Sequence, residues 1–287
     1  MSKNSERTIS VTGATGRQGG AVYRHLRKKG FKLRALVREP SSNQARQLMR
    51  NGLEVFQGSF DDPGSVMRAM GGVYGVFSVQ PFTAHEIEQG VAVIEAAKRR
   101  NVSQFVYSSV GSADEETGIP HFESKIGVEE RLRSSGLQYT IVRPVFFMEN
   151  WQRAFGASIR NGQLQLPLSP ATKLQMIAVD DIGAFAALMF EHPEKWKNRT
   201  ISLAGDELSM QQIAGTFSRV TGQDVKYVQV SWDQFEKNMG RELTVMYRWF
   251  EEKGFHFNIE EVRREYPLTY SFNRWLDACW GMTPSDP

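Results

Sequence analysis

The chain passes from a short apolar segment into a glycine cluster at Ile9-Ser10-Val11-Thr12-Gly13-Ala14-Thr15-Gly16-Arg17-Gln18-Gly19-Gly20. The first four of these residues have the apolar, partly β-branched character of a buried strand. Apolar residues then recur at helical spacing from Ala21 to Leu26, and Gly30 ends the predicted helix. A strand, a glycine-rich turn and a helix in this order begin a nucleotide-binding α/β domain.

Three glycines of the turn, Gly13, Gly16 and Gly19, have the spacing G-x-x-G-x-x-G. In such a turn the first glycine permits a tight bend, the second lets the backbone approach a pyrophosphate, and the third lets the helix pack closely. The N–H groups at the start of the helix then face the phosphates. A glycine-rich turn without a ligand would show the same spacing, but the flanking strand and helix favour dinucleotide binding.

The rest of the N-terminal half alternates between predicted strands and helices. The predicted strands are 32–37, 53–56, 76–79, 105–107 and 139–142. The predicted helices are 44–50, 66–70, 86–100 and 125–133. Parallel strands need a crossover between them, usually a helix. The alternation therefore predicts an α/β fold of the Rossmann type, a doubly wound parallel sheet with a smaller, mixed C-terminal lobe.

The alternation becomes less regular after Asn150. We expect a helix over 151–160 and two strands, 174–178 and 200–203, that rejoin the main sheet. From Asp206 onward the chain is rich in aromatic residues, which is typical of the core of a smaller lobe. The expected division is a dinucleotide-binding domain over 1–150, with its sheet completed within 174–206, and a smaller lobe over 151–173 and 207–287.

The composition excludes several classes of protein. Of the 287 residues, 40% are hydrophobic and 23% are charged, which is typical of a folded domain. Cys279 is the single cysteine, which excludes an internal disulfide framework, and the five histidines show no shared spacing that indicates a metal site. No segment has the length of a membrane span, and residues 1–8 lack a signal-peptide core, so we expect a cytoplasmic protein.

The end of the second predicted strand indicates which dinucleotide is bound. An NAD site would place an acidic residue there to bind the ribose 2′-hydroxyl. This chain has Arg38 at that position and Arg17 in the glycine loop, and a guanidinium suits a 2′-phosphate. Glu39 is the nearest acid, but it lies one position later. The sequence therefore predicts NADP(H) rather than NAD as the cofactor.

Several short motifs follow one another along most of the chain. They are Thr12-Gly13-Ala14-Thr15-Gly16-Arg17-Gln18-Gly19-Gly20, Val37-Arg38-Glu39-Pro40, Gln57-Gly58-Ser59-Phe60-Asp61-Asp62, His121-Phe122-Glu123-Ser124-Lys125 and Arg143-Pro144-Val145-Phe146-Phe147-Met148-Glu149-Asn150. A weaker motif is Val179-Asp180-Asp181-Ile182-Gly183. Because these motifs occur in this order, the chain resembles the NmrA-like branch of the atypical short-chain dehydrogenase/reductase superfamily.

This resemblance implies binding roles for particular residues. At the pyrophosphate they are Gly13, Ala14, Thr15, Gly16, Arg17, Gln18 and Gly19. At the 2′-phosphate and the adenine they are Arg38, Asp61 and Asp62. At the nicotinamide end they are Gln80, Pro81, Phe82, Lys125, Phe147, Met148, Glu149 and Asn150. The two aspartates can also cap a helix that starts at Pro63, and this role is compatible with ligand binding.

A catalytic role is less clearly indicated. Active short-chain dehydrogenases have a tyrosine four residues before a lysine, and the lysine helps the phenol to act as acid or base. Here Lys125 is present and Ser108 or Ser109 ends the fifth strand, but His121 stands at the tyrosine position. An imidazole can donate a proton near neutral pH, so His121 is a candidate acid. A histidine that only lines the pocket is the alternative.

Three functions remain open for such a chain. The absent tyrosine and the resemblance favour a redox sensor that binds NADP(H) and acts through a regulatory protein partner. The alternative is an NADPH-dependent reductase of quinones or similar small aromatic substrates, which accept hydride with little help from a protein acid. A nucleic-acid-binding regulator is disfavoured, because the net charge is only +3 and the basic pairs 99–100 and 263–264 are expected on solvated helix faces.

Overall fold

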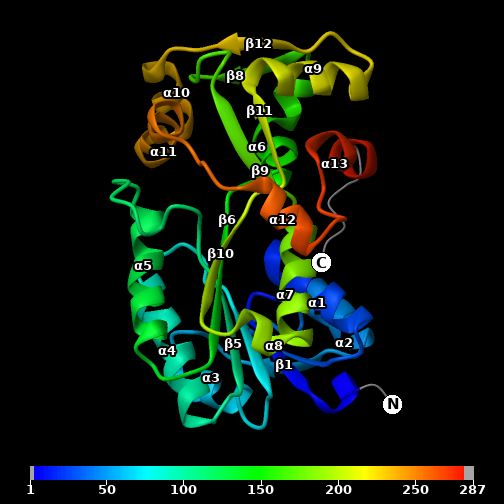
Figure 1. Ribbon diagram of the computed structural model, residues 1–287, viewed down its shortest axis with the longest axis vertical. Helices are drawn as coiled ribbons and strands as arrows, with labels where there is room; N and C mark the ends of the chain where they lie inside the picture. The colour runs from blue at the N-terminus through cyan, green and yellow to red at the C-terminus, as the bar shows by residue number, and fades with distance from the viewer. Residues whose placement is uncertain (1–2, 281–287) are drawn as a thin grey trace.

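A computed structural model describes residues 3–280 of the chain. Its centre is a parallel sheet of seven strands in the order β3-β2-β1-β4-β5-β6-β10, with helices on both faces (Figure 1). The strands are β1 (Thr8–Val11), β2 (Lys32–Val37), β3 (Glu54–Gln57), β4 (Gly75–Ser78), β5 (Gln104–Ser108), β6 (Tyr139–Pro144) and β10 (Arg199–Leu203). The strand order reverses between β1 and β4, which confirms the predicted doubly wound fold.

The helices form one layer on each face of the sheet. One layer consists of α3 (Pro63–Ala69), α4 (Glu86–Arg99) and α5 (Pro120–Arg133). The other consists of α1 (Arg17–Lys28), α2 (Asn43–Arg50) and α7 (Val179–Glu191). Two short helices, η1 (Lys3–Glu6) and α8 (Pro193–Trp196), precede β1 and β10. Figure 1 shows α3, α4 and α5 on the side of the sheet opposite α1, α2 and α7.

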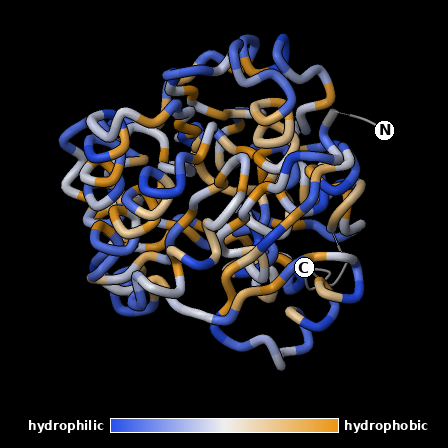
Figure 2. Tube along the Cα trace, turned by 90° about the horizontal axis from the view of Figure 1, so that it is seen from below, coloured by the Kyte–Doolittle hydropathy of each residue, from blue (hydrophilic) through white to orange (hydrophobic). Residues whose placement is uncertain are grey.

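The sheet is buried on both faces, and two apolar clusters hold the layers together. Ile9 and Val11 of β1 belong to one cluster with Val22 of α1. Val76 of β4 belongs to the second cluster with Ile94 of α4. Full burial of one such side chain stabilises the fold by about 1.5–3 kcal/mol. The apolar segments accordingly lie inside the molecule and the polar ones around it (Figure 2).

The two strands that were predicted to rejoin the sheet have different places. β10 pairs with β6 in parallel and completes the sheet, as predicted. The prediction for 174–178 was wrong, because β9 (Lys173–Ile177) belongs to a separate three-stranded sheet with β7 (Phe146–Phe147) and β11 (Asp206–Ser209). The physical reason is that β10 already occupies the free edge of β6, so β9 pairs with the chain that leaves β6.

The smaller lobe is built around this second sheet and a two-stranded sheet. Its remaining elements are α6 (Glu149–Arg160), β8 (Gln163–Leu166), α9 (Met210–Thr221), β12 (Lys226–Gln229), α10 (Trp232–Met239), α11 (Arg241–Glu252), α12 (Ile259–Glu265) and α13 (Phe272–Cys279). Trp151 is fully buried and contacts the rings of Phe155, Phe217 and Phe272. These aromatic side chains therefore form the core of the lobe. The division of the chain at residue 150 stays a prediction.

The start of α5 differs from the sequence prediction in a way that matters for the site. The helix begins at Pro120 instead of residue 125. Proline is well suited to the first helical position, because its missing N–H group would have no partner there. His121 therefore lies in the first turn of α5 and Lys125 one turn later. Within residues 3–280, no helix has the length and apolar character that a membrane crossing requires.

Candidate functional site

The glycine loop forms a tight turn between β1 and α1. Gly13 has a positive φ of 61°, and the N–H of Gly16 donates to its carbonyl at 2.8 Å. A Cβ on Gly19 would lie 2.2 Å from the carbonyl oxygen of Gly13, so only glycine lets the helix pack against the loop. A Cβ on Gly16 would lie 3.2 Å from the same oxygen. The loop thus leaves backbone N–H groups uncovered at the positive end of α1.

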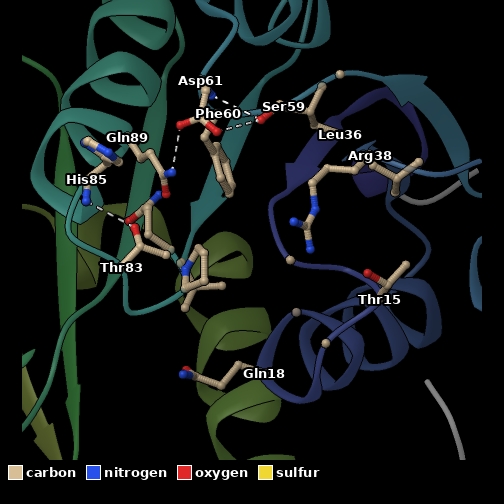
Figure 3. Close-up of a pocket in the computed structure, with 18 of the residues that line it drawn as sticks. Thr15, Gln18, Leu36, Arg38, Ser59, Phe60, Asp61, Thr83, His85 and Gln89 are labelled. Carbon is tan, nitrogen blue, oxygen red and sulfur yellow. Dashed lines mark hydrogen bonds between the residues drawn. The ribbon is translucent and has the colours of Figure 1, made fainter.

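A cavity of about 580 Å³ lies at the carboxyl ends of the central strands (Figure 3). It is lined by Gly13, Thr15, Gly16, Arg17, Gln18, Gly19, Leu36, Val37, Arg38, Gly58, Ser59, Phe60, Asp61, Val79, Gln80, Pro81, Thr83, His85, Gln89 and Phe147. Most of these residues lie at or just after the ends of β1, β2, β3 and β4, the strands on either side of the point where the strand order reverses, while Gln89 belongs to α4 and Phe147 to β7. Open α/β sheets bind their ligands at this place.

One end of the cavity lies between Arg38 and the loop after β3. Figure 3 shows the guanidinium of Arg38 and the ring of Phe60 pointing into the same space. Hydrogen bonds from Gln89 at 2.9 Å and from Ser59 at 3.2 Å lower the pKa of the Asp61 carboxyl and hold it as an acceptor. Glu39 is absent from the lining, and its carboxylate accepts a hydrogen bond from the Ser41 hydroxyl.

Two residues predicted near the cofactor are absent from the cavity lining. Asp62 caps α3 by accepting from the N–H of Gly64 at 2.9 Å, and it does not line the cavity. Ala14, within the glycine loop, is buried. Asp62 therefore caps α3 as expected, while its role near the adenine stays a prediction, and Asp61 lines the cavity.

Residues from β7 and the start of α6 meet the glycine loop. Phe147 lines the cavity, and Asn150 accepts a hydrogen bond from Arg17 at 3.3 Å. Met148 is fully buried in the core. Glu149 is partly buried, and desolvation raises the pKa of its carboxyl, which accepts from the N–H of Val179 at 2.9 Å and thereby caps α7. The predicted set 147–150 is thus divided between the cavity wall and the core.

The other end of the cavity has an aromatic rim. Gln80 and Pro81 line the cavity, and Phe82 follows with 52% of its surface exposed. The ring of Phe82 lies edge-on to the imidazole of His121, with 5.3 Å between the ring centroids. Phe82 and His121 therefore lie beside the cavity without being part of its lining.

The two candidate catalytic side chains are each paired with a carboxylate. Lys125 bonds to Glu86, which also accepts from the Ser124 hydroxyl at 2.6 Å. Glu86 is 1% exposed, so this ion pair is buried. The Nδ1 atom of His121 lies 2.6 Å from a carboxylate oxygen of Glu242 in α11. Neither His121 nor Lys125 lines the cavity, and no hydrogen bond joins them.

Sequence reasoning missed several residues of the site. Ser59 and Phe60 line the cavity and directly follow β3, so their place at the carboxyl end of a strand was the available signal. Glu242 lies 121 residues from His121 and belongs to no motif, so no local pattern indicates it. Among residues 3–280, no group of three or more histidine, cysteine, aspartate or glutamate side chains is arranged to hold a metal ion.

The sequence model of the NmrA-like family matches residues 5–278. This chain belongs to the NmrA-like family. The match covers nearly the whole length, including the smaller lobe, and confirms the resemblance that the short motifs indicate.

Known proteins that are similar to this chain include enzymes and a regulator. It is 31% identical to the NAD(P)H azoreductase of Xenophilus azovorans over 238 residues, which cover 80% of each chain. The NADPH-dependent quinone oxidoreductase QOR2 of Escherichia coli superimposes with a TM-score of 0.82 and 24% identity, over 94% of this chain and 99% of that one. NmrA, a negative transcriptional regulator solved with NAD, gives a TM-score of 0.80 and 21% identity, over 96% and 95%. The two solved structures show a shared fold.

Proposed function

We propose that this NmrA-like protein is a reductase that uses NADP(H) to reduce small, planar two-electron acceptors such as quinones. The observation that carries the proposal is the form of the cavity, which runs from the cationic Arg38 to the exposed aromatic rim at Phe82 and His121. A dinucleotide needs a phosphate-binding turn and a cationic end, and a flat acceptor needs an accessible apolar surface. The cavity and its rim combine these features.

The residues of the cavity suit the cofactor. The glycine loop presents N–H groups to a pyrophosphate, and the tight contact at Gly19 explains why a side chain is absent there. Arg38 can bind a 2′-phosphate, whereas Glu39, which would suit a free 2′-hydroxyl, is turned to Ser41. When bound, NADPH supplies a hydride. These contacts support NADP(H) as the preferred dinucleotide.

The rim suits a flat acceptor. Phe82 offers an exposed ring face, and His121 is fixed beside it by ring contacts to Phe82 and Phe122. Stacked aromatic pairs contribute about 0.5–1.5 kcal/mol beyond the area that they bury. The names of two relatives, an azoreductase and a quinone oxidoreductase, are consistent with acceptors of this shape.

The test is oxidation of NADPH by the purified protein with menadione, other quinones and an azo dye as acceptors. We expect turnover that Gly16→Val reduces at least tenfold, because the valine side chain would fill the space next to the carbonyl of Gly13 where a pyrophosphate approaches the backbone. Gly215→Ala is the matched control, since a Cβ there meets nothing within 4 Å. Unimpaired NADPH binding by a folded Gly16→Val protein would place the cofactor elsewhere.

A redox sensor is the second candidate function. It is favoured by His121 at the position of the usual tyrosine and by the engagement of Lys125 with Glu86, which together remove the tyrosine–lysine pair. The shared fold with the regulator NmrA is consistent with it. A sensor must bind NADPH and NADP⁺ with different affinities, since a ligand shifts a conformational equilibrium only through such a difference. Unequal binding by calorimetry, together with no turnover of any acceptor, would replace the reductase by the sensor.

A further inference from the structure

One hydrogen bond crosses the point where the strand order reverses. The hydroxyl of Ser108, the last residue of β5, donates to the side-chain oxygen of Gln18 at 2.7 Å. Gln18 is the second residue of α1, the helix that follows β1 and the glycine loop. The two residues are 90 positions apart in the sequence. The bond therefore ties the start of the phosphate-binding helix to a strand in the other half of the sheet.

The alternation of side chains along β5 explains why Ser108 reaches α1. Val106, two residues earlier, belongs to the same apolar cluster as Val22 of α1, whereas Tyr107 belongs to the cluster on the opposite face. Successive side chains of a strand point to opposite faces, so Ser108 shares the face of Val106. Ser108 is fully buried there. A buried hydroxyl needs a hydrogen-bond partner, and Gln18 of the neighbouring helix provides it.

This hydrogen bond determines which end of the Gln18 carboxamide faces a ligand. The side-chain oxygen accepts from Ser108, so the amino group at Nε2 is left as a donor. Among residues 3–280 no group accepts a hydrogen bond from this amino group, and Gln18 lines the cavity. Figure 3 shows its side chain extending from α1 away from Thr15 and Arg38. The amino group is therefore accessible to a ligand on the side of the glycine loop that faces β4 and β5.

We propose that Ser108 is a positioning residue that holds the amino group of Gln18 toward the pyrophosphate of a dinucleotide, which rests on the proposed binding of NADP(H). A pyrophosphate at the glycine loop lies beside the first turn of α1, where Gln18 is. Phosphate oxygens form strong hydrogen bonds with N–H donors. A carboxamide that rotates freely could turn its oxygen to the phosphates and repel them. The Ser108 hydroxyl excludes that orientation.

The first test measures the dissociation constants of NADPH and NADH by fluorescence titration. Gln18→Ala removes a donor to a charged group, so NADPH should bind about tenfold more weakly or worse. Ser108→Ala keeps Gln18 but frees its carboxamide, and the cost of ordering that side chain should weaken NADPH binding about three- to tenfold. Both cofactors contain the pyrophosphate, so each variant should weaken NADH by the same factor. A loss confined to NADPH would place the contact at the 2′-phosphate and overturn the proposal.

A fragment of the cofactor separates positioning from a general disturbance of the cavity. Adenosine 2′-monophosphate carries the adenine, the ribose and the 2′-phosphate, but it has no pyrophosphate. Ser108→Ala and Gln18→Ala should therefore bind it as tightly as the wild type does in calorimetry. If both variants lost as much affinity for this fragment as for NADPH, the substitutions would be distorting the whole cavity, and the positioning role would be wrong.

Control variants test the hydrogen bond itself. Ser10→Ala is the matched control, because the Ser10 hydroxyl is equally buried but has no hydrogen-bond partner within the described residues, and its affinity for NADPH should be unchanged. Ser108→Thr keeps the hydroxyl and should regain part of the affinity. Adding Ser108→Ala to Gln18→Ala should cause no further loss, because Ser108 acts through Gln18. Additive losses in the double variant would contradict this.

The behaviour of the wild type separates this proposal from the proposed function. A wild type that binds neither cofactor would overturn the binding of NADP(H), and the role of Ser108 with it. If the wild type binds NADPH and a folded Ser108→Ala protein binds it equally well, only the role of Ser108 is overturned. The expected losses of affinity in a protein that reduces no acceptor would support the positioning role and overturn the reductase.

Discussion

Arg38 is the residue that we expect to determine the choice of cofactor. It follows β2, which was predicted with the bounds that the structure shows, Lys32–Val37. Its guanidinium points into the cavity on the side of Thr15 and Phe60 (Figure 3). Glu39 is adjacent in sequence, but consecutive residues of an extended chain point in opposite directions, so it turns away to Ser41. One position in the sequence thus separates a cation that lines the cavity from an acid that does not.

Replacement of Arg38 should change the preference between cofactors. A hydrogen bond to a charged group contributes about 1.5–3 kcal/mol, so Arg38→Ala should weaken NADPH binding at least tenfold and leave NADH binding nearly unchanged. Fluorescence titration with both cofactors measures the effect. Arg50→Ala, at the exposed end of α2, is the control and should alter neither affinity. An unchanged preference for NADPH in Arg38→Ala would show that another group binds the 2′-phosphate.

At the scale of elements, the closest helix packing in the nucleotide-binding half joins α1 and α7. A Cβ on Gly183 of α7 would lie 2.7 Å from the backbone carbonyl of Ala21 in α1. The glycine therefore lets the two helices approach until their backbones touch. Since α1 directly follows the glycine loop, this contact helps to hold the loop against the sheet.

A methyl group at Gly183 should force the two helices apart. Overpacking of a close contact costs about 1–3 kcal/mol, so Gly183→Ala should lower the free energy of unfolding by that amount in chemical denaturation. Gly215→Ala in α9 meets open space and should instead stabilise its helix by about 0.5–1 kcal/mol. Equal stabilities of the two alanine variants would contradict the close packing of α1 and α7.

At the scale of the whole molecule, a buried carboxyl joins the two halves. Asp181 of α7 is 1% exposed and accepts from the N–H of Tyr270, which precedes α13 of the lobe. Burial, together with the nearby carboxylates of Asp180 and Glu149, raises the pKa of Asp181 to about 7. The folded protein therefore holds a proton at pH values where the unfolded chain has lost it.

This carboxyl should make the protein less stable as the pH rises. Its pKa is about 7 in the folded state and 3.8 in an ordinary environment, so stability should fall from about pH 4 to pH 7 and then level off. The three pKa units correspond to at most about 4 kcal/mol. Asp181→Asn keeps an acceptor for Tyr270 and should flatten part of this dependence, as measured by Tm between pH 5 and 8. Asp233→Asn, at an exposed site, should keep the wild-type slope.

Much of the nucleotide-binding half was predictable, because its signals are contiguous. The strand, the glycine turn and the helix within residues 9–30 can be recognised from the residues of this one segment. The structure has β1, the loop and α1 there. The position of Arg38 after β2 and the capping of α3 by Asp62 were also predictable, because both depend only on neighbouring residues. The start of α5 was predicted five residues late, since Gly118, Ile119 and Pro120 are also compatible with a loop.

The sequence by itself determined the doubly wound sheet, the phosphate-binding turn and the cationic position after β2, because periodicity and glycine spacing act over a few residues. Tertiary structure alone decided which strand occupies the edge of β6, which carboxylate binds Lys125, and that Glu242 meets His121. These contacts join residues far apart in the chain. Their partners are selected by how the helices and the lobe pack around the finished sheet, and no local pattern records that packing.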